Sequence, residues 1–190
     1  MKHLILIALL LVSVFCHAQL PTLFDGGMML HAGVVNGQMS DLNYTAKGVT
    51  TGIGGTLRFH LCRHLRVGCE GFMSTLSQLG NDSYVRLGWG GVVVDAYWQL
   101  DRWTPYVGLT LGGGNATTLL VFDGSSDDWL PEPNAVLHSE GFMFVDPYLG
   151  IEYALTEAVH LTLRVDRLAP FSHSDIPTGP RLYLGFIFTH

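Results

Sequence analysis

The sequence predicts an all-β fold, an eight-stranded antiparallel up-and-down transmembrane β-barrel that follows an N-terminal signal peptide. Hydrophobic residues make up 48% of the 190-residue chain and charged residues only 14%, while 23 residues are glycine. This mix is too apolar for a disordered chain and too rich in glycine for a helical one. Eight segments alternate apolar and polar side chains, and their connections alternate between short and long, as in transmembrane barrels.

The N-terminus has the pattern of a cleaved signal. Lys2 and His3 precede an apolar run from Leu4 to Phe15, which is shorter than the roughly 20 residues that a spanning helix needs. Cys16 and Ala18 then place small side chains at the −3 and −1 positions of a cleavage site before Gln19. The sequence therefore predicts a signal peptide over 1–18 and one barrel domain over 19–190. The alternative is a lipoprotein signal with Cys16 lipidated, against which the bulky Phe15 argues.

The alternating segments predict eight strands and place their apolar faces. The clearest alternation sets Val159, Leu161, Leu163 and Val165 against His160, Thr162, Arg164 and Asp166. In the fourth segment the parity changes at Gly90-Gly91, which predicts a β-bulge with Val85, Leu87 and Trp89 facing outward. The expected strands cover 27–36, 49–61, 66–76, 84–98, 104–113, 142–153, 159–166 and 181–189.

Short connections near 62–65, 99–103 and 154–157 predict tight turns at one end of the barrel. Longer polar connections at 37–47, 77–83, 114–140 and 168–179 predict loops at the other end. A soluble lipocalin-like barrel would have a similar alternation, with its apolar face inward. Glycines crowd the charged face here, Lys47 in a predicted loop is the single lysine after the signal, and aromatic residues gather near strand ends. These features favour the membrane.

Three segments carry a resemblance to a known family: WQLDRWTPYVGLTLGGG (98–114), DPYLGIEYALTEAVHLTLRVDRL (146–168) and PRLYLGFIFTH (180–190). The mature chain resembles the OmpA/OmpX-type bacterial outer-membrane β-barrel superfamily. The resemblance implies a place in the outer membrane of a Gram-negative-type bacterium, in contact with its lipid and lipopolysaccharide after insertion by the barrel assembly machinery. It also implies a role in envelope integrity, adhesion or narrow permeation. The terminal aromatic of such barrels is displaced here, because Thr189 and His190 follow Phe188.

Charged residues on the polar strand faces are the first candidate site. An eight-stranded barrel is just wide enough to be filled by side chains, so charges inside it must be paired or hydrated. We expect a lumen charge network that largely closes the barrel; a gated small-solute channel through the same residues is the alternative. The network comprises Arg58, Glu70, Arg86, Asp95, Asp146, Glu152, Arg164, Asp166 and Arg181.

The 114–140 segment is the second candidate site, as a loop that binds an extracellular ligand. Asp123, Asp127, Asp128 and Trp129 would form its tip, beside a stiff Pro131-Glu132-Pro133 turn. An aromatic flanked by acids suits partner binding, since tryptophan is frequent among residues that dominate interfaces. The alternative is that Trp129 folds back onto the barrel mouth.

Other functions find little support in the sequence. The clusters His138-Ser139-Glu140 and Ser172-His173-Ser174-Asp175 suggest a lipid A deacylase-like enzyme, but neighbouring strand residues point to opposite faces, so we expect no enzyme. The Asp123, Ser125 and Asp127 spacing lacks the glycine and glutamate of a calcium loop. We therefore expect no metal and no cofactor. With 16 acidic against 10 basic residues, nucleic acid is not an expected partner.

Overall fold

The computed structural model describes residues 24–39, 44–76, 84–121, 135–171, 176 and 178–190. The predicted signal peptide lies outside these residues. The described strands are β1 (Phe24–Met39), β2 (Tyr44–Cys62), β3 (Leu65–Leu76), β4 (Tyr84–Tyr97), β5 (Trp103–Val121), β6 (Ala135–Ala154), β7 (Val159–Arg167), β8 (Ala169–Pro170) and β9 (Pro180–Thr189).

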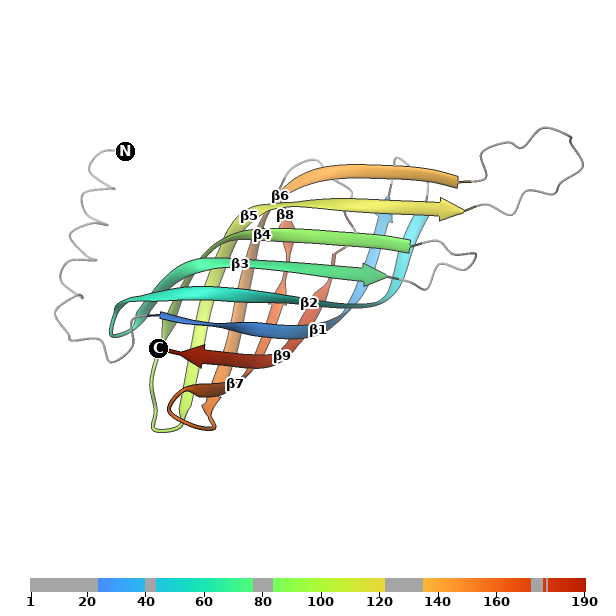
Figure 1. Cartoon of the computed structure of the whole chain (residues 1–190). Helices are drawn as coiled ribbons and strands as arrows, with labels where there is room; N and C mark the ends of the chain where they lie inside the picture. The colour runs from blue at the N-terminus through green and yellow to red at the C-terminus, as the bar shows by residue number, and fades with distance from the viewer. Residues whose placement is uncertain (1–23, 40–43, 77–83, 122–134, 172–175, 177) are drawn as a thin grey trace, which may run out of the picture.

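These strands close into a tilted barrel (Figure 1). The order is β5-β4-β3-β2-β1-β9-β7-β6, and β5 pairs with β6 to complete the ring. The short β8 continues β7, because Tyr148↔Asp166 and Phe144↔Pro170 keep one register along β6. All neighbouring pairs are antiparallel. The predicted eight-stranded antiparallel barrel is therefore confirmed. Among the described residues, no helix is long and apolar enough to cross a membrane.

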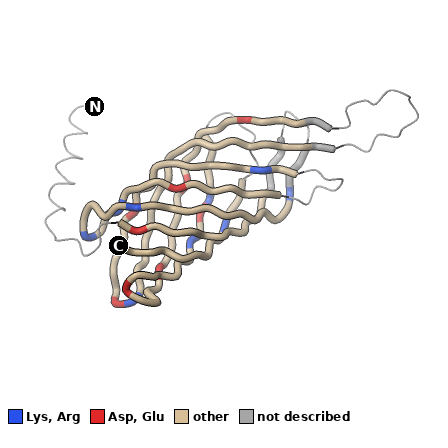
Figure 2. Tube along the Cα trace, in the orientation of Figure 1, with Lys and Arg blue, Asp and Glu red and all other residues tan. Residues whose placement is uncertain are grey.

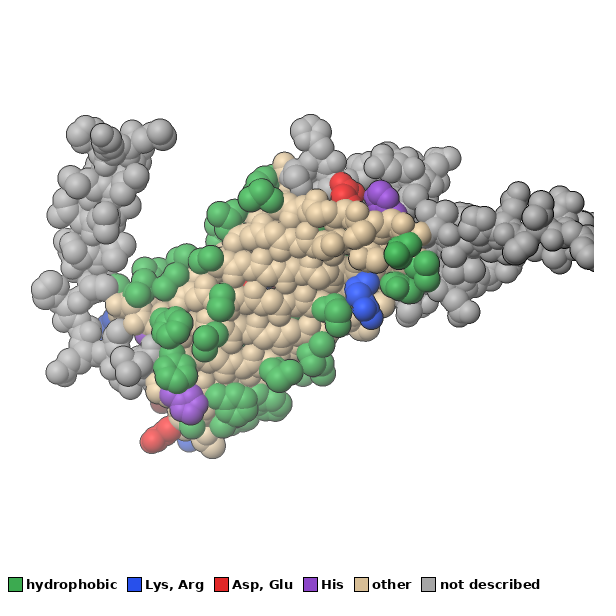
Figure 3. Space-filling model, turned by 45° about the horizontal axis from the view of Figure 1, so that its top comes forward, with side chains coloured by type: hydrophobic (Ala, Val, Ile, Leu, Met, Phe, Trp, Pro, Cys, Tyr) green, Lys and Arg blue, Asp and Glu red, His purple; other side chains and the backbone are tan. Residues whose placement is uncertain are grey.

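The outside of the barrel is apolar and the inside is largely polar, the reverse of a soluble barrel. Large hydrophobic side chains stand exposed along every long strand, among them Met28, Val92, Leu111, Leu149 and Leu184. Figure 3 shows such side chains spread over the barrel wall. Exposed apolar surface on this scale is unfavourable in water and favourable in lipid. The exterior is therefore built to face hydrocarbon.

The predicted bulge in β4 is wrong. The pairs Glu70↔Gly91 and Gly71↔Gly90 lie in one unbroken register with the rest of β3 and β4. Val85, Trp89 and Val93 consequently point inward on the same face as Asp95. The glycine at position 91 serves close approach instead, because a β-carbon there would run into the backbone of Leu111 on β5.

The predicted place of Arg86 inside the lumen is wrong for the same reason. Since β4 keeps one parity, Arg86 lies opposite the face of Val85 and Trp89 and is exposed on the outer wall. It pairs across the sheet with Thr75 and Thr117, near the loop end of β4. Arg86 therefore does not belong to the lumen charge network.

The predicted loop 114–140 is also too long. Pairing between β5 and β6 runs without a break from Gly114↔Phe142 to Val121↔Ala135. The run Gly112-Gly113-Gly114-Asn115 has low strand propensity, yet a paired neighbour holds it extended. Residues 122–134 are left as the connection, and the candidate tip residues Asp123, Asp127, Asp128 and Trp129 lie outside the described residues. Lys47, expected in a loop, lies on β2.

Candidate functional site in the barrel lumen

Buried charges fill the middle of the barrel. Eight of the nine predicted residues lie inside it, all less than 9% exposed, and Asp25 and Arg66 join them. Figure 2 shows that these positions come from strands all round the barrel. They form two clusters. The turn-side cluster comprises Asp25, Arg58, Arg66, Asp95 and Glu152, and the loop-side cluster comprises Glu70, Asp146, Arg164, Asp166 and Arg181.

The two arginines of the turn-side cluster share three carboxylates. Arg58 donates from Nε to Asp25 at 2.6 Å and from Nη2 to Glu152 at 2.8 Å. Arg66 donates from Nε to Asp95 at 2.6 Å and from Nη1 to Glu152 at 3.2 Å. These contacts join β1, β2, β3, β4 and β6, so the cluster ties together strands that are not neighbours in the sheet.

The loop-side cluster is arranged in the same manner. Arg164 pairs with Glu70 at 2.5 Å and with Asp166 at 3.3 Å. Arg181 pairs with Asp166 at 2.7 Å and with Asp146 at 2.9 Å. The Thr110 hydroxyl donates to Glu70 at 2.6 Å. Every carboxylate of both clusters thus contacts at least one guanidinium, which offsets the cost of burying it.

Tyrosines connect and cover the two clusters. The Tyr148 hydroxyl donates to Asp95 at 3.2 Å, and the Arg164 guanidinium lies 3.9 Å from the centre of its ring. The Arg66 guanidinium lies 4.6 Å from the centre of the Tyr97 ring, whose hydroxyl is 2.9 Å from His60. Charge–ring contacts of this kind are favourable in a site shielded from water.

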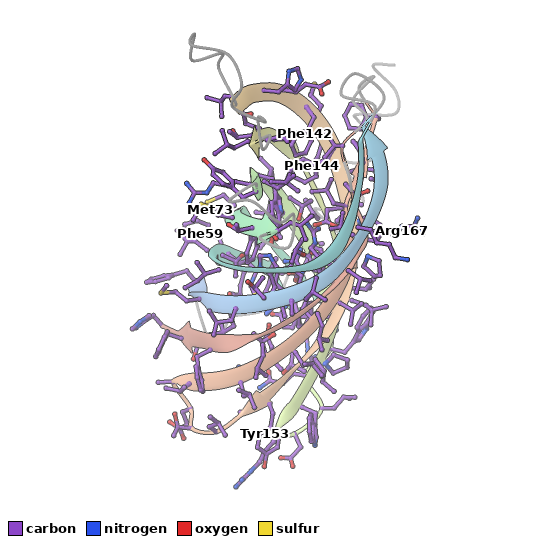
Figure 4. The ribbon with its side chains drawn as sticks, turned by 90° about the vertical axis from the view of Figure 1, so that its right-hand side faces the viewer. Phe59, Met73, Phe142, Phe144, Tyr153 and Arg167 are labelled. Carbon is purple, nitrogen blue, oxygen red and sulfur yellow. The ribbon has the colours of Figure 1, made fainter. Side chains whose placement is uncertain are left out.

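A cluster of apolar side chains packs among the loop-side charges. It is built from Met29, Phe72, Trp89, Ala116, Phe142, Phe144, Leu168, Ile176 and Tyr183, all buried. Figure 4 shows Phe142 and Phe144 pointing into the barrel, whereas Phe59 and Arg167 point away from it. The His31 ring stands among them, 5.5 Å from Trp89 and 4.9 Å from Tyr183 between ring centres. Aromatic rings and loop-side charges are therefore intermixed: the Arg181 guanidinium lies 4.3 Å from the centre of the Trp89 ring, and the Arg164 guanidinium lies 5.7 Å from the centre of the Phe72 ring.

A cavity opens at the tight-turn end, below the turn-side cluster. It measures about 650 Å³ and is lined by Asp25, His60, Arg66, Tyr97, Glu152 and His160, among others. His60 sits on its wall with Nε2 at 2.8 Å from Asp25. The ion-paired residues form the inner end of this cavity, so solvent from the turn side meets the charge clusters first.

Two network residues were missed in the sequence for different reasons. Asp25 precedes the strand expected over 27–36, whereas β1 begins at Phe24. Arg66 shares strand parity with Gly68 and Glu70, so its alternation already indicated an inward side chain. Its cross-strand partner on β2 is His60, whose ring lies 2.8 Å from the lumen residue Asp25.

The enzyme candidates do not assemble into a site in the described part of the chain. His138, Ser139 and Glu140 lie on β6, where neighbouring residues alternate between the two faces. The Ser139 hydroxyl donates to the Asn115 side chain at 3.0 Å. Residues 172–175 lie outside the described residues, as do Asp123, Ser125 and Asp127. Within the described ranges, no group of three or more histidine, cysteine, aspartate or glutamate residues could hold a metal ion.

Crowding inside the lumen predicts a sharp difference between two glycines. A β-carbon at Gly108 would meet the Tyr148 ring and lie 2.6 Å from Cβ of Asp95, whereas one at Gly88 would meet nothing within 4 Å. We expect Gly108→Val to lower the free energy of unfolding by about 1–3 kcal/mol through overpacking. Gly88→Val should change it by less than about 0.5 kcal/mol. Urea titration of the refolded barrel measures both; equal effects would contradict the packed lumen.

Comparison with known proteins supports the fold. No protein-family model matches the sequence, and no curated protein is similar to it. Among solved structures, the barrel is similar to neisserial surface protein A, with a TM-score of 0.57 and 16% identity over 88% of this chain and 96% of that one. It is also similar to Ail, the attachment invasion locus protein of Yersinia pestis, solved with the heparin analogue sucrose octasulfate. That match has a TM-score of 0.54 and 9% identity over 88% of this chain and 99% of that one. The fold is therefore that of the eight-stranded outer-membrane β-barrels.

Proposed function

We propose that this protein is a non-enzymatic outer-membrane scaffold whose lumen is closed to solutes and whose surface loops carry envelope, adhesion or partner-binding functions. The observation that carries the proposal is the filled lumen, whose interior is occupied by two ion-paired clusters and a cluster of packed aromatic rings. A lumen filled in this way would leave solutes no continuous water-filled path. In such a barrel the loops can vary in sequence without disturbing the packed lumen, so we place specific functions there.

The exterior and the fold support the location. The apolar outer wall suits a bilayer, and the solved barrels of the same fold are a bacterial surface protein and an attachment protein by name. In the proposed topology, residues 1–18 are a cleaved signal peptide and 19–190 are inserted by the barrel assembly machinery. The tight turns face the periplasm and the long loops face outward. Outer-membrane lipid and lipopolysaccharide then surround the wall.

The β5–β6 connection is the proposed ligand-binding loop. Its strands β5 and β6 project beyond the other hairpins (Figure 1), and the proposed tip residues Asp123, Asp127, Asp128 and Trp129 lie between these strands in the sequence. Four side chains of the segment 122–134 are Asp or Glu and none is basic. A partner with a basic, partly apolar surface fits this composition. Ail, with the same fold, was solved with a ligand bound, which supports ligand binding as a role open to such barrels.

Deleting residues 123–134 tests the scaffold proposal. We expect the deletion variant to insert and keep its heat-modifiable mobility in gels, because long surface loops contribute little to closure. Binding of cells to host or abiotic surfaces should fall relative to the wild type, both in the deletion variant and in a variant in which a glycine-serine segment of equal length replaces 123–134. Loss of insertion in both variants would show that the segment is structural and contradict the proposal.

A further inference from the structure

On the described strands, the charged side chains of the outer wall are all basic. Lys47 on β2, Arg86 on β4 and Arg167 on β7 are exposed there, each within a few residues of the loop end of its strand. Every Asp and Glu on the described strands shares a strand face with the buried lumen residues instead. None of the three cations forms an ion pair within the described ranges. The wall is therefore basic at the level where the bilayer surface would lie.

Two of these cations flank a groove on the outside of the wall. The groove measures about 600 Å³ and lies over the ends of β1, β2, β7 and β9, between Lys47 and Arg167. The pairs Val34↔Val49 and Arg167↔Pro180 set its floor. Figure 4 shows Arg167 pointing away from the barrel. Gly179 lets the chain approach closely, since a β-carbon there would meet the carbonyl oxygen of Val34.

The surroundings of the groove define its occupant. Toward the middle of the wall it runs into exposed apolar side chains, Val165 on β7 and Leu182 on β9. An occupant must therefore place an anionic group between Lys47 and Arg167 and hydrocarbon below it. A soluble anion would satisfy the cations but leave the apolar wall unused. A phosphorylated lipid satisfies both, because basic residues at a membrane surface attract lipid phosphates.

We propose that the Lys47–Arg167 groove binds a phosphate group of an outer-leaflet glycolipid, with its acyl chains along β7 and β9. The proposal rests on the outer-membrane location proposed above and adds a defined lipid site to it. Arg167 supplies a planar fork that can hold two phosphate oxygens, and Lys47 supplies a mobile point charge from the opposite side. Arg86, the third exposed cation of the outer wall, lies on β4, away from this groove. It does not contribute to the proposed site.

Lipid A in nanodiscs is the probe for this site. The full chain is reconstituted in phosphatidylcholine nanodiscs, and bisphosphorylated lipid A retained by the barrel is measured by native mass spectrometry against the dephosphorylated form. The test variant is the double substitution Lys47→Gln and Arg167→Gln. The control is Arg63→Gln with Arg102→Gln, which removes the same charge from the tight-turn end, where both side chains are exposed. Heat-modifiable mobility checks that each variant is folded.

We expect the double variant to bind bisphosphorylated lipid A roughly thirtyfold more weakly, as two surface charges imply. The control should bind like the wild-type barrel, and Lys47→Arg should retain binding. Equal retention of dephosphorylated lipid A, equal losses in test and control variants, or full competition by inorganic phosphate would each overturn the lipid site. Failure of the wild-type barrel to insert into nanodiscs would contradict the proposed function instead, so the two failures are distinguishable.

Discussion

Replacing Arg164 by Met is expected to lower the free energy of unfolding of the barrel by about 3–5 kcal/mol. Arg164 is the one guanidinium in contact with Glu70 among the described residues, and it also pairs with Asp166. Both side chains of the Arg164–Glu70 pair are almost fully buried. Removing the arginine leaves a carboxylate without a counter-charge in a site that water barely reaches. That penalty, more than the lost contact itself, causes the destabilisation.

Two comparisons make this prediction specific. Arg167→Met, on the same strand but on the outer wall, should change the free energy of unfolding by less than about 0.5 kcal/mol. The double variant Arg164→Met with Glu70→Met should recover most of the loss, because the buried charge leaves with its partner. Urea titration of the refolded barrel, followed by tryptophan fluorescence, measures all three. An Arg164→Met barrel as stable as the wild type would contradict a paired, water-poor lumen.

Alternation along the strands made most of the fold predictable. On β7 every expected inward and outward side chain has its expected place, including Arg164 and Asp166, and on β9 Arg181 faces inward as expected. This works because the pattern reports which of two faces is apolar, and a barrel has two faces. Loop lengths then orient the hairpins. Eight strands and their direction followed from these two signals.

The same signal failed where the lumen itself is apolar. On β4, Val85 and Trp89 belong to the inner face, as Asp95 does. Placing every apolar residue on the outer face required a bulge in β4, and it also put Arg86 wrongly on the inner face. The aromatic cluster forms only in the assembled barrel, because Phe72, Trp89 and Phe142 come from three different strands, β3, β4 and β6.

Which charged side chains of the network pair with one another could not be predicted from the sequence either. Arg164 and Glu70 are 94 residues apart and come from strands on different sides of the ring. Their meeting depends on the tilt and register of every strand between them. Sequence parity predicted that both side chains face inward, and it could not predict that they touch. Asp25 was absent from the predicted network for a simpler reason: the first strand was expected to begin at residue 27, and strand ends are set by cross-strand pairing as much as by local propensity.

The barrel is expected to give no stable conductance in a planar lipid bilayer. An ion crossing the lumen would have to displace guanidinium–carboxylate contacts of 2.5–2.9 Å and pass between the packed rings of Phe72 and Trp89. Eight-stranded barrels have interiors just wide enough for their own side chains. The cavity of about 650 Å³ at the tight-turn end stops at the turn-side cluster.

Planar-bilayer recording of the purified, refolded wild-type protein in molar potassium chloride tests this most directly. Insertion is verified beforehand by heat-modifiable mobility, and an open porin added to the same bilayer afterwards shows that channels would be detected. We expect a baseline without steps from the wild-type barrel, followed by steps when the porin is added. Stable, porin-like steps from the wild-type barrel itself would contradict the closed lumen and make the protein a channel.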